Sequence, residues 1–388
     1  MISFELSPEQ HALRDMVDKF VKKEIIPVAA EYDARGELPL DVAQKAYELG
    51  LINAGIPEEY GGSSMGMMEL CLIAEGLSYG CAGIATSLLL NSIATIPIMF
   101  FGNQEQKEKY LKLLCESEKI KFISFALTEP GAGSDVAAIT TKADKQNTEY
   151  VINGRKTLIT NGDLASIYVV LAKTDFSKSH KGGMSAFIVS RMPGITVGRK
   201  EDKMGVRASH TVELIFEDVR VPEENLLGEE GQGFAVAMEA LDRSRALAAA
   251  TALGLAQRAL DESLKYASKR VQFGKPLLEQ QLIQLKLAEM SMGIDAARLL
   301  TWRAAWLVDQ GKLPILESSQ AKAMAGDVAV RAAVEAVQIF GGYGYSKEYP
   351  VEKLYRDAKI FQIYEGTNEI QRVVIAAELA KSLDRFGV

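Results

Sequence analysis

The spacing of the apolar residues changes twice along this chain, and that change restricts the fold more than any other feature. Up to about residue 120 the apolar residues recur at helical spacing, as in Leu13–Val21, which follows a helix-start pattern at Ser7–Gln10. Between about 121 and 232, short β-branched runs alternate with turn-forming residues. From about 233 the helical spacing returns. The pattern therefore predicts helices, then a sheet, then helices.

The strand-like runs of the middle segment lie at 150–152, 167–171, 186–189 and 212–216, with turn formers such as Asn153-Gly154 between them. Because most of these runs have no helix-length connection between them, the sheet is expected to be largely antiparallel. The last segment has long alanine-rich helical faces and short connections, which predict a helical bundle.

The predicted fold class is α+β in three parts. An N-terminal helical domain is expected over residues 1–120, a central β domain over 121–232 and a C-terminal helical bundle over 233–388. At about 150 residues per domain, a chain of 388 residues has room for two or three domains.

Charge and composition exclude several classes of protein. The chain has 44 Lys and Arg against 51 Asp and Glu, a net charge of −7, which opposes binding to nucleic acid or an anionic membrane. No targeting segment is recognised at the start, so a cytoplasmic location is expected, or the mitochondrial matrix for a processed chain. The uncharged stretch 76–104 could span a bilayer by length, but it is too polar for lipid and is expected to be a buried helix beside a cavity.

Cysteine and histidine spacing gives no sign of a metal site. Cys71, Cys81 and Cys115 lack C-x-x-C spacing, and the three histidines form no H-x-x-x-H pair. The cysteines are therefore expected to be buried, reduced thiols, and no bound metal is expected.

Four glycine-marked segments have both a structural and a functional interpretation. Residues 127–135 form either a turn or a loop that meets a phosphate. Residues 154–162 form a strand with a turn at each end, which is either part of a hairpin or a backbone edge for a planar cofactor. Arg270, in 270–274, suits either a helix C-terminus or a diphosphate. At 338–345 a helix ends in glycines without a preceding strand, so a nicotinamide-type site is not predicted.

A fifth segment, 364–372, places Glu365 in a short break between two helical runs. Judged by composition alone, a glutamate in such a break is more often solvated than catalytic.

Taken together, the five segments resemble the acyl-CoA dehydrogenase family, closest to its medium- and short-chain members. The match lies in the order and spacing of 128–135, 158–162, 270–274, 338–344 and 364–372, and it covers nearly the whole chain. The resemblance implies an N-terminal α domain, a central β domain and a C-terminal four-helix bundle assembled as a homotetramer. It also implies FAD as the cofactor, an electron-transferring flavoprotein as the electron acceptor, and a place in fatty-acid β-oxidation.

The same resemblance assigns residues to the cofactor. Those that would contact FAD from one chain are Phe125, Ala126, Leu127, Thr128, Ser134, Leu158, Ile159 and Thr160, with Thr367 and Glu369 over the nucleotide. Those that would complete the site from a neighbouring subunit are Arg270, Gln272, Phe273, Gln281, Gln338, Gly341 and Gly342.

The resemblance also assigns the base and the substrate contacts. Glu365 matches the base that removes the α-proton of an acyl-CoA while the β-hydrogen leaves as hydride to flavin N5, which gives a trans-2-enoyl-CoA. Burial would raise the pKa of Glu365 toward neutrality, which suits a general base. Leu88–Ile98 is expected to line the acyl pocket, and the residues expected to contact the acyl-CoA are Ser134, Asp242, Arg245 and Gly366.

Two positions separate this chain from other members of the family. In the isovaleryl-type branch the base replaces the residue equivalent to Ser244, so Ser244 together with Glu365 disfavours that branch. Leu158 stands where the family usually has an aromatic residue, which keeps an acyl-CoA oxidase-like enzyme as an alternative. A DNA-associated or non-catalytic flavoprotein is disfavoured by the acidic charge and by the presence of the base and the FAD motifs. The acyl group is left open as straight, branched or alicyclic.

Overall fold

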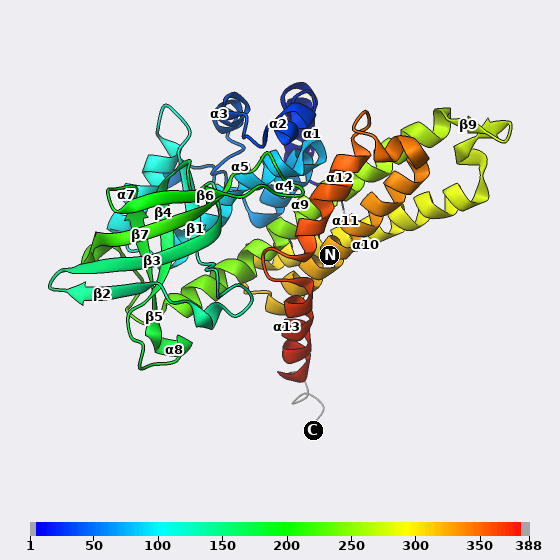
Figure 1. Cartoon of the computed structure of the whole chain (residues 1–388). Coiled ribbons are helices and arrows are strands. Elements are labelled where there is room, and N and C mark those ends of the chain that lie inside the picture. The colour runs from blue at the N-terminus through cyan, green and yellow to red at the C-terminus, as the bar shows by residue number, and fades with distance from the viewer. Residues whose placement is uncertain (1–4, 382–388) are drawn as a thin grey trace.

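The computed structural model describes residues 5–381, and Figure 1 shows helices at both ends of the chain on either side of a sheet. Residues 1–4 and 382–388, at the outer ends of the first and third predicted domains, lie outside the described residues. The N-terminal helices are α1 (Pro8–Phe20), α2 (Ala29–Arg35), α3 (Leu40–Glu48), α4 (Met67–Gly80), α5 (Ala82–Ala94), α6 (Ile96–Phe101) and α7 (Gln104–Cys115). The predicted order of helices, sheet and helices is confirmed.

Local signals set the start of α1. The Ser7 hydroxyl accepts a hydrogen bond from the Gln10 N–H at 3.2 Å, and the Gln10 side chain accepts one from the Ser7 N–H at 3.0 Å. This is the capping box predicted from the sequence, and it satisfies two donors that the helix leaves unpaired.

The apolar stretch 76–104 contains the one helical segment among residues 5–381, Ala82–Phe101, that is long and apolar enough to cross a membrane. That test uses length and composition alone, and the core helix of a soluble protein passes it too. Since 67% of the most apolar window is buried inside the protein, the predicted core helix is the better description.

The sheet contains β1 (Phe122–Ala126), β2 (Lys142–Gln146), β3 (Glu149–Thr160), β4 (Ala165–Lys173), β5 (Met184–Ser190), β6 (Ile195–Lys200), β7 (Thr211–Pro222) and β8 (Leu226–Leu227). Its order is β6-β7-β3-β2-β4-β5-β8, with β1 beside β4 and a short helix α8 (His180–Gly183) before β5. The pairs are antiparallel except β1–β4 and β2–β4. The largely antiparallel sheet is confirmed, although β1, β2, β6 and β8 were not among the predicted runs.

One predicted turn is wrong. Asn153-Gly154 was expected to separate two strands, but β3 continues through both residues. Gly154 has φ +155° at a shift in the register with β7, and a Cβ there would lie 2.4 Å from the Thr141 hydroxyl oxygen. The glycine is therefore needed for a bulge and a close approach inside the strand.

The C-terminal part consists of α9 (Gly233–Lys269), α10 (Gln281–Asp309), α11 (Ile315–Phe340), α12 (Val351–Ala358) and α13 (Asn368–Lys381). A small hairpin of β9 (Val271–Gln272) and β10 (Lys275–Pro276) joins α9 to α10. At about 1.5 Å per residue, the 37 residues of α9 span about 55 Å. Figure 1 shows this helix running from beside the sheet to the hairpin at the opposite end of the molecule.

The three cysteines are unpaired. Cys71 and Cys81 are buried as predicted, whereas Cys115, at the last residue of α7, is partly exposed.

Candidate active site

The loop between α12 and α13 has an unusual backbone at Glu365. Glu365 has φ +56° and the next residue, Gly366, has φ +84°, so two successive residues lie in the left-handed region. Only glycine adopts this conformation without a steric cost, so Glu365 is held there by its surroundings. The Gln371 amide donates to the Glu365 carbonyl at 3.0 Å and to the Gly366 carbonyl at 3.2 Å.

The carboxyl group of Glu365 faces α9. The Ser244 hydroxyl donates a hydrogen bond to Glu365 Oε2 at 3.0 Å. Burial raises the pKa of Glu365, and this effect outweighs the opposite influence of the Ser244 hydrogen bond and of the positive charges on Arg245 and Lys322. The direction of this shift is the one expected from the sequence.

Two further candidates, Asp242 and Arg245, lie on the same helix and form a buried ion pair. Arg245 also donates to the Ser319 hydroxyl at 3.3 Å, while its buried Nε has no hydrogen-bond partner. Burial raises the pKa of Asp242, although Arg245 opposes the shift. The positive charge of Arg245 acts on Glu365 and opposes the rise of its pKa. Ser134, in contrast, is exposed on the loop after β1.

The candidates for the flavin edge come together where β1 ends beside β3. The Thr157 N–H donates to the Thr128 carbonyl at 2.9 Å, and the Ser124 hydroxyl donates to the Thr160 carbonyl at 2.8 Å. These contacts place Phe125–Thr128 beside Leu158–Thr160. Leu158 has φ +57° at a shift in the β3–β7 register, and it is 56% exposed.

The loop after β1 is held by a buried lysine on one side and has open space on the other. Lys156, on β3, donates to the Leu127 carbonyl at 2.9 Å and to Glu129 at 2.8 Å. Further along the loop, a Cβ added at Gly131 or Gly133 would meet no atom within 4 Å. The loop therefore has free space over its backbone that a ligand could occupy.

A second group of candidates lies at the hairpin end of α9. Arg270, Gln272, Gly341 and Gly342 line a cavity of about 610 Å³. Phe273 is at the tip of the hairpin and is 95% exposed. Gln281, the first residue of α10, and Gln338, in the last turn of α11, are also exposed, but they do not line the cavity. The expected helix ends are confirmed, because Arg270 follows the last residue of α9 and Gly341 caps α11 with φ +63°.

One chain does not bring the two groups together. Arg270 lies 26 residues after Ser244 on α9, which is about 39 Å along the helix axis. In Figure 1 the hairpin β9–β10 and the sheet lie at opposite ends of the molecule. A dinucleotide that touched both groups would therefore have to lie between two copies of the chain.

Thr367 and Glu369 lie at the start of α13. The Thr367 hydroxyl accepts a hydrogen bond from the Ile370 N–H at 3.2 Å, which caps the helix. Glu369 is exposed, and hydrogen bonds from its own backbone N–H and from Thr367 lower its pKa. Thr367 ends the loop that carries Glu365, and Glu369 lies in the first turn of the helix that follows it.

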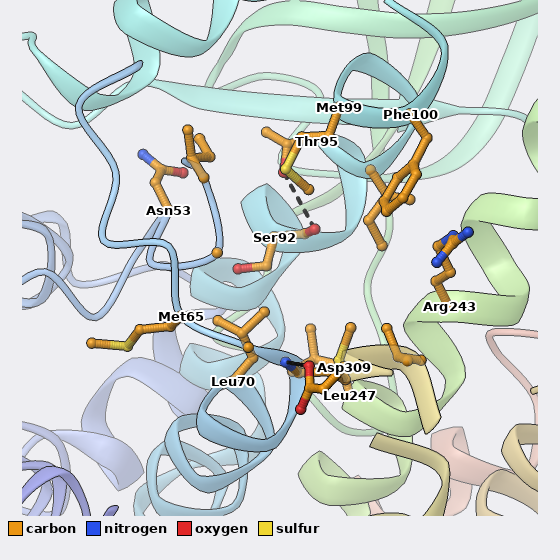
Figure 2. A pocket seen from close by; sticks show the side chains of 16 residues that line it. Asn53, Met65, Leu70, Ser92, Thr95, Met99, Phe100, Arg243, Leu247 and Asp309 are labelled. Atoms are coloured by element: carbon orange, nitrogen blue, oxygen red, sulfur yellow. Dashed lines mark hydrogen bonds between the residues drawn. The ribbon is translucent and has the colours of Figure 1, made fainter. Parts of the chain in front are cut away.

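The stretch expected to line the acyl pocket borders a cavity of about 210 Å³, shown in Figure 2. Ser92, Thr95 and Ile96 line it, whereas Leu88–Asn91 and Glu365 do not. Arg243 and Leu247 form its α9 side and Asp309 its α10 side. The cavity is therefore next to α9 within one helical turn of Ser244, but it is not the space directly around Glu365.

Reasoning from the sequence missed two residues of this site. Lys322, on α11, is 2% exposed and donates to the Gly366 carbonyl at 2.6 Å, and Gln371 is fully buried beside it. The available signal was a lysine flanked by alanines on the apolar face of a long helix, since a buried lysine needs a partner.

Comparison with known proteins gives matches along almost the whole chain. Family models described as the N-terminal, middle and C-terminal domains of acyl-CoA dehydrogenase match residues 7–118, 124–219 and 231–380. A mitochondrial short-chain specific acyl-CoA dehydrogenase of Rattus norvegicus is 46% identical over 98% of this chain and 92% of its own length. An acyl-CoA dehydrogenase of Bacillus subtilis is 46% identical over 96% of this chain and 98% of its own. The solved structure of butyryl-CoA dehydrogenase from Megasphaera elsdenii has a TM-score of 0.94 and 45% identity, covering 98% of this chain and 100% of the other.

Proposed function

Because this chain belongs to the acyl-CoA dehydrogenase family of oxidoreductases, we propose that it converts an acyl-CoA thioester to the trans-2-enoyl-CoA with Glu365 as the base. The observation that carries the assignment of the base is the contact between Glu365 and Ser244. A partly buried carboxyl with a raised pKa suits proton abstraction near neutral pH. Hydrogen bonds from Ser244, Lys322 and Gln371 hold this carboxyl and its loop in place.

The proposed chemistry divides between this chain and its cofactor. Glu365 takes the proton from the α-carbon, and the electron pair of that C–H bond becomes the new α,β double bond as the β-hydrogen departs with its own pair. The backbone N–H of Glu365 is proposed to donate to the thioester oxygen, where negative charge develops. When bound, FAD supplies the two-electron acceptor for the β-hydrogen.

The residues present fit FAD. Gly131 and Gly133 leave open space above the loop after β1, and Gly341 and Gly342 do the same beside the 610 Å³ cavity that Arg270 lines. An arginine fork suits a diphosphate, and open glycine backbone lets a ligand approach closely. We propose that FAD lies between the β1–β3 residues of one copy and the hairpin end of another.

Assembly with further copies is supported by an exposed apolar row on α10. Leu285, Met292, Leu299 and Trp306 recur at every seventh residue, and all four side chains are exposed. A seven-residue repeat keeps one face of a helix toward a partner helix. The homotetramer expected from the resemblance is consistent with this second surface and is proposed here.

A short straight acyl group is the substrate proposed, since two of the relatives carry the names short-chain specific acyl-CoA dehydrogenase and butyryl-CoA dehydrogenase. An electron-transferring flavoprotein is the proposed electron acceptor. The second candidate function is an oxidase that passes electrons to dioxygen, and the exposure of Leu158 favours it. Separate measurement of oxygen consumption and of dye-linked turnover distinguishes the two.

Anaerobic titration with a panel of acyl-CoAs tests the proposal. The purified protein is expected to be yellow and to bleach with saturated acyl-CoAs, most completely with short chains. The Glu365→Gln variant should keep its FAD and bind acyl-CoA but fail to bleach. Normal bleaching in that variant would overturn the assignment of the base.

A further inference from the structure

We propose that Lys322, a buried residue of α11, is a positioning residue for Glu365. Its ammonium binds the Gly366 carbonyl and so holds the turn that contains Glu365. This inference rests on the proposed role of Glu365 as the base. The ammonium of Lys322 donates to the Gly366 carbonyl at 2.6 Å and to Asn368 Oδ1 at 3.1 Å. Lys322 does not touch the substrate on this proposal; it acts through the backbone of its neighbour.

Lys322 is itself fixed. Its side chain is 2% exposed on α11, in the region where α11 packs against α9 and α13. The Asn368 amide, which accepts from Lys322, donates to the Ala323 carbonyl at 3.0 Å and to Asp327 Oδ1 at 2.8 Å. These hydrogen bonds fix the position of the loop relative to α11. Ser244, which donates a hydrogen bond to the Glu365 carboxyl, belongs to α9.

The loop needs such a restraint. Glu365 has a left-handed backbone that disfavours a side chain, so without outside contacts the turn would relax and the carboxyl would move away from Ser244. Two donors oppose that change, the neutral amide of Gln371 and the charged amine of Lys322. A hydrogen bond from an ionised donor is the stronger kind, which makes Lys322 the firmer of the two.

The charge of Lys322 adds a second effect. Burial lowers the pKa of Lys322 to about 8, and the positive charge of Arg245 acts in the same direction, whereas the carboxylates of Glu365, Asp327 and Glu369 oppose the shift. Below about pH 8 the ammonium remains charged and lowers the pKa of Glu365, which burial raises. Removing this charge should raise the pKa of Glu365 further and leave less of the base ionised.

Two substitutions separate the hydrogen bond from the charge. Lys322→Met removes both, whereas Lys322→Gln keeps a donor that can reach toward Gly366 but removes the charge. Gln371→Leu does the reverse, because it removes a neutral donor from the carbonyls of Glu365 and Gly366 and leaves the charge of Lys322 in place. Arg331→Met is the matched control, because it removes a surface cation from the same helix α11, where Arg331 is paired with Glu289.

The readout is proton exchange, which needs no electron transfer. The probe is an acyl-CoA analogue with sulfur in place of the β-carbon, which can lose an α-proton to the base but has no β-hydrogen to give. Exchange of its α-hydrogens with D₂O is followed by mass spectrometry across pH 5–9. Binding of the analogue, flavin content and thermal melting are measured on the same oligomeric protein.

We expect Lys322→Met to slow exchange at pH 7 by about tenfold to a hundredfold with little change in analogue binding. Its acid limb, the rise of the rate as the base ionises, should move to higher pH. Lys322→Gln should show the same pH movement with a smaller loss of rate, and Gln371→Leu a loss of rate without the pH movement. Arg331→Met should match the unaltered chain in both.

Unaltered exchange with an unaltered acid limb in both Lys322 variants would overturn the proposal. A second outcome would also overturn it: a Lys322 variant that loses exchange rate and analogue binding together while its acid limb stays at the same pH. That is the behaviour of a purely structural lysine. If Lys322→Met does not fold, Lys322→Gln and Gln371→Leu decide the question by the same criteria. Glu365→Gln is run in parallel, and if it exchanges normally the failure lies in the assignment of the base and not in Lys322.

Discussion

The ammonium of Lys156 lies 2.8 Å from the carboxylate of Glu129, and both side chains are buried where β3 passes beneath the loop after β1. Oε1 of Glu129, which faces Lys156, also accepts a hydrogen bond from the Thr141 N–H at 3.0 Å, and Oε2 accepts one from the Thr140 N–H at 2.6 Å. The pair therefore joins three segments of the chain directly below the loop proposed to face the flavin.

Removing one member of this pair should cost more than a surface pair would. Lys156→Met leaves the carboxylate of Glu129 buried without its partner, and we expect the free energy of unfolding to fall by about 3–5 kcal/mol. The double variant Lys156→Met/Glu129→Leu should recover part of that loss. Urea unfolding of the unaltered chain, Lys156→Met and the double variant checks it, and a double variant no more stable than Lys156→Met would contradict it.

The same pair predicts sensitivity to acid. Burial alone would raise the pKa of Glu129, but Lys156 and the hydrogen bonds from Thr141 and Thr140 outweigh it and lower the pKa to about 2, from an ordinary 4.5. A lowered pKa means that the contribution to stability is present above about pH 4.5 and is lost as the pH falls toward 2. Comparing unfolding of the unaltered chain with Glu129→Gln between pH 6 and pH 3 should show the difference shrinking as the solution becomes more acid.

Ser244→Ala should change the pH dependence of catalysis. The Ser244 hydroxyl stabilises the ionised form of Glu365, so its removal should raise the pKa of Glu365 and move the acid limb of turnover to higher pH. Since losing a hydrogen bond to a charged group is worth more than 1 kcal/mol, the rate at pH 7 should drop about tenfold. Ser263→Ala is the control, because Ser263 is buried on the same helix and bonds only the Ala259 carbonyl.

Asp309 should stabilise the start of α4 from the far end of α10. Its carboxylate accepts hydrogen bonds from the N–H groups of Met67 at 2.5 Å and Met68 at 3.0 Å, the first two residues of α4. Asp309→Ala removes this cap and should lower the free energy of unfolding by about 1 kcal/mol, whereas Asp309→Asn, which retains one acceptor, should lose less. Equal stability of all three proteins in urea would show that water replaces the cap.

Leu158→Trp should change how the reduced enzyme is reoxidised. Leu158 is exposed at a bulge of β3 beside the residues proposed to contact the flavin, so a larger side chain should cover more of that edge. We expect a slower reaction with dioxygen or an altered rate with the electron acceptor, measured by stopped-flow reoxidation. If both rates match those of the unaltered chain, Leu158 has no part in access to the flavin.

Mixing two inactive variants should restore activity if the site lies between copies. Glu365→Gln disables the base end of a chain and Arg270→Met the hairpin end, so one of the two sites in each mixed pair contains neither change. Random pairing of equal amounts should leave about a quarter of the sites intact. Turnover after unfolding and refolding the mixture measures this, and refolding each variant alone is the control. No recovery would place both residues in a site made by one chain.

Elements with local signals were predictable from the sequence. The cap of α1 follows from the four consecutive residues Ser7–Gln10, and the apolar spacing of Leu13–Val21 after them marks the helix itself. Strand β1 was missed because its pairing with β4 is parallel and depends on residues more than forty positions away. The turn predicted at Gly154 was wrong because the strand continues there by pairing with β7, which also lies far away along the chain.

The candidate site also contains some features that the sequence predicts and others that it does not. The break at Glu365 and the helix ends at Arg270 and Gly341 were visible in the sequence, because glycine and a change of apolar spacing mark them. The contact of Lys322 with Gly366 spans 44 positions and depends on how α11 packs against the loop. Charge and spacing along the chain do not reveal such a contact.

The length of α9 has a consequence for inheritance. Because Ser244 lies about 39 Å before Arg270 along this helix, each chain in the proposed assembly contributes to two sites and completes neither of them alone. A substitution in the hairpin, for example at Phe273, would leave the base of its own chain intact and impair the site of its neighbour. In a cell that carries two alleles, the product of the healthy allele would therefore be affected by the altered one.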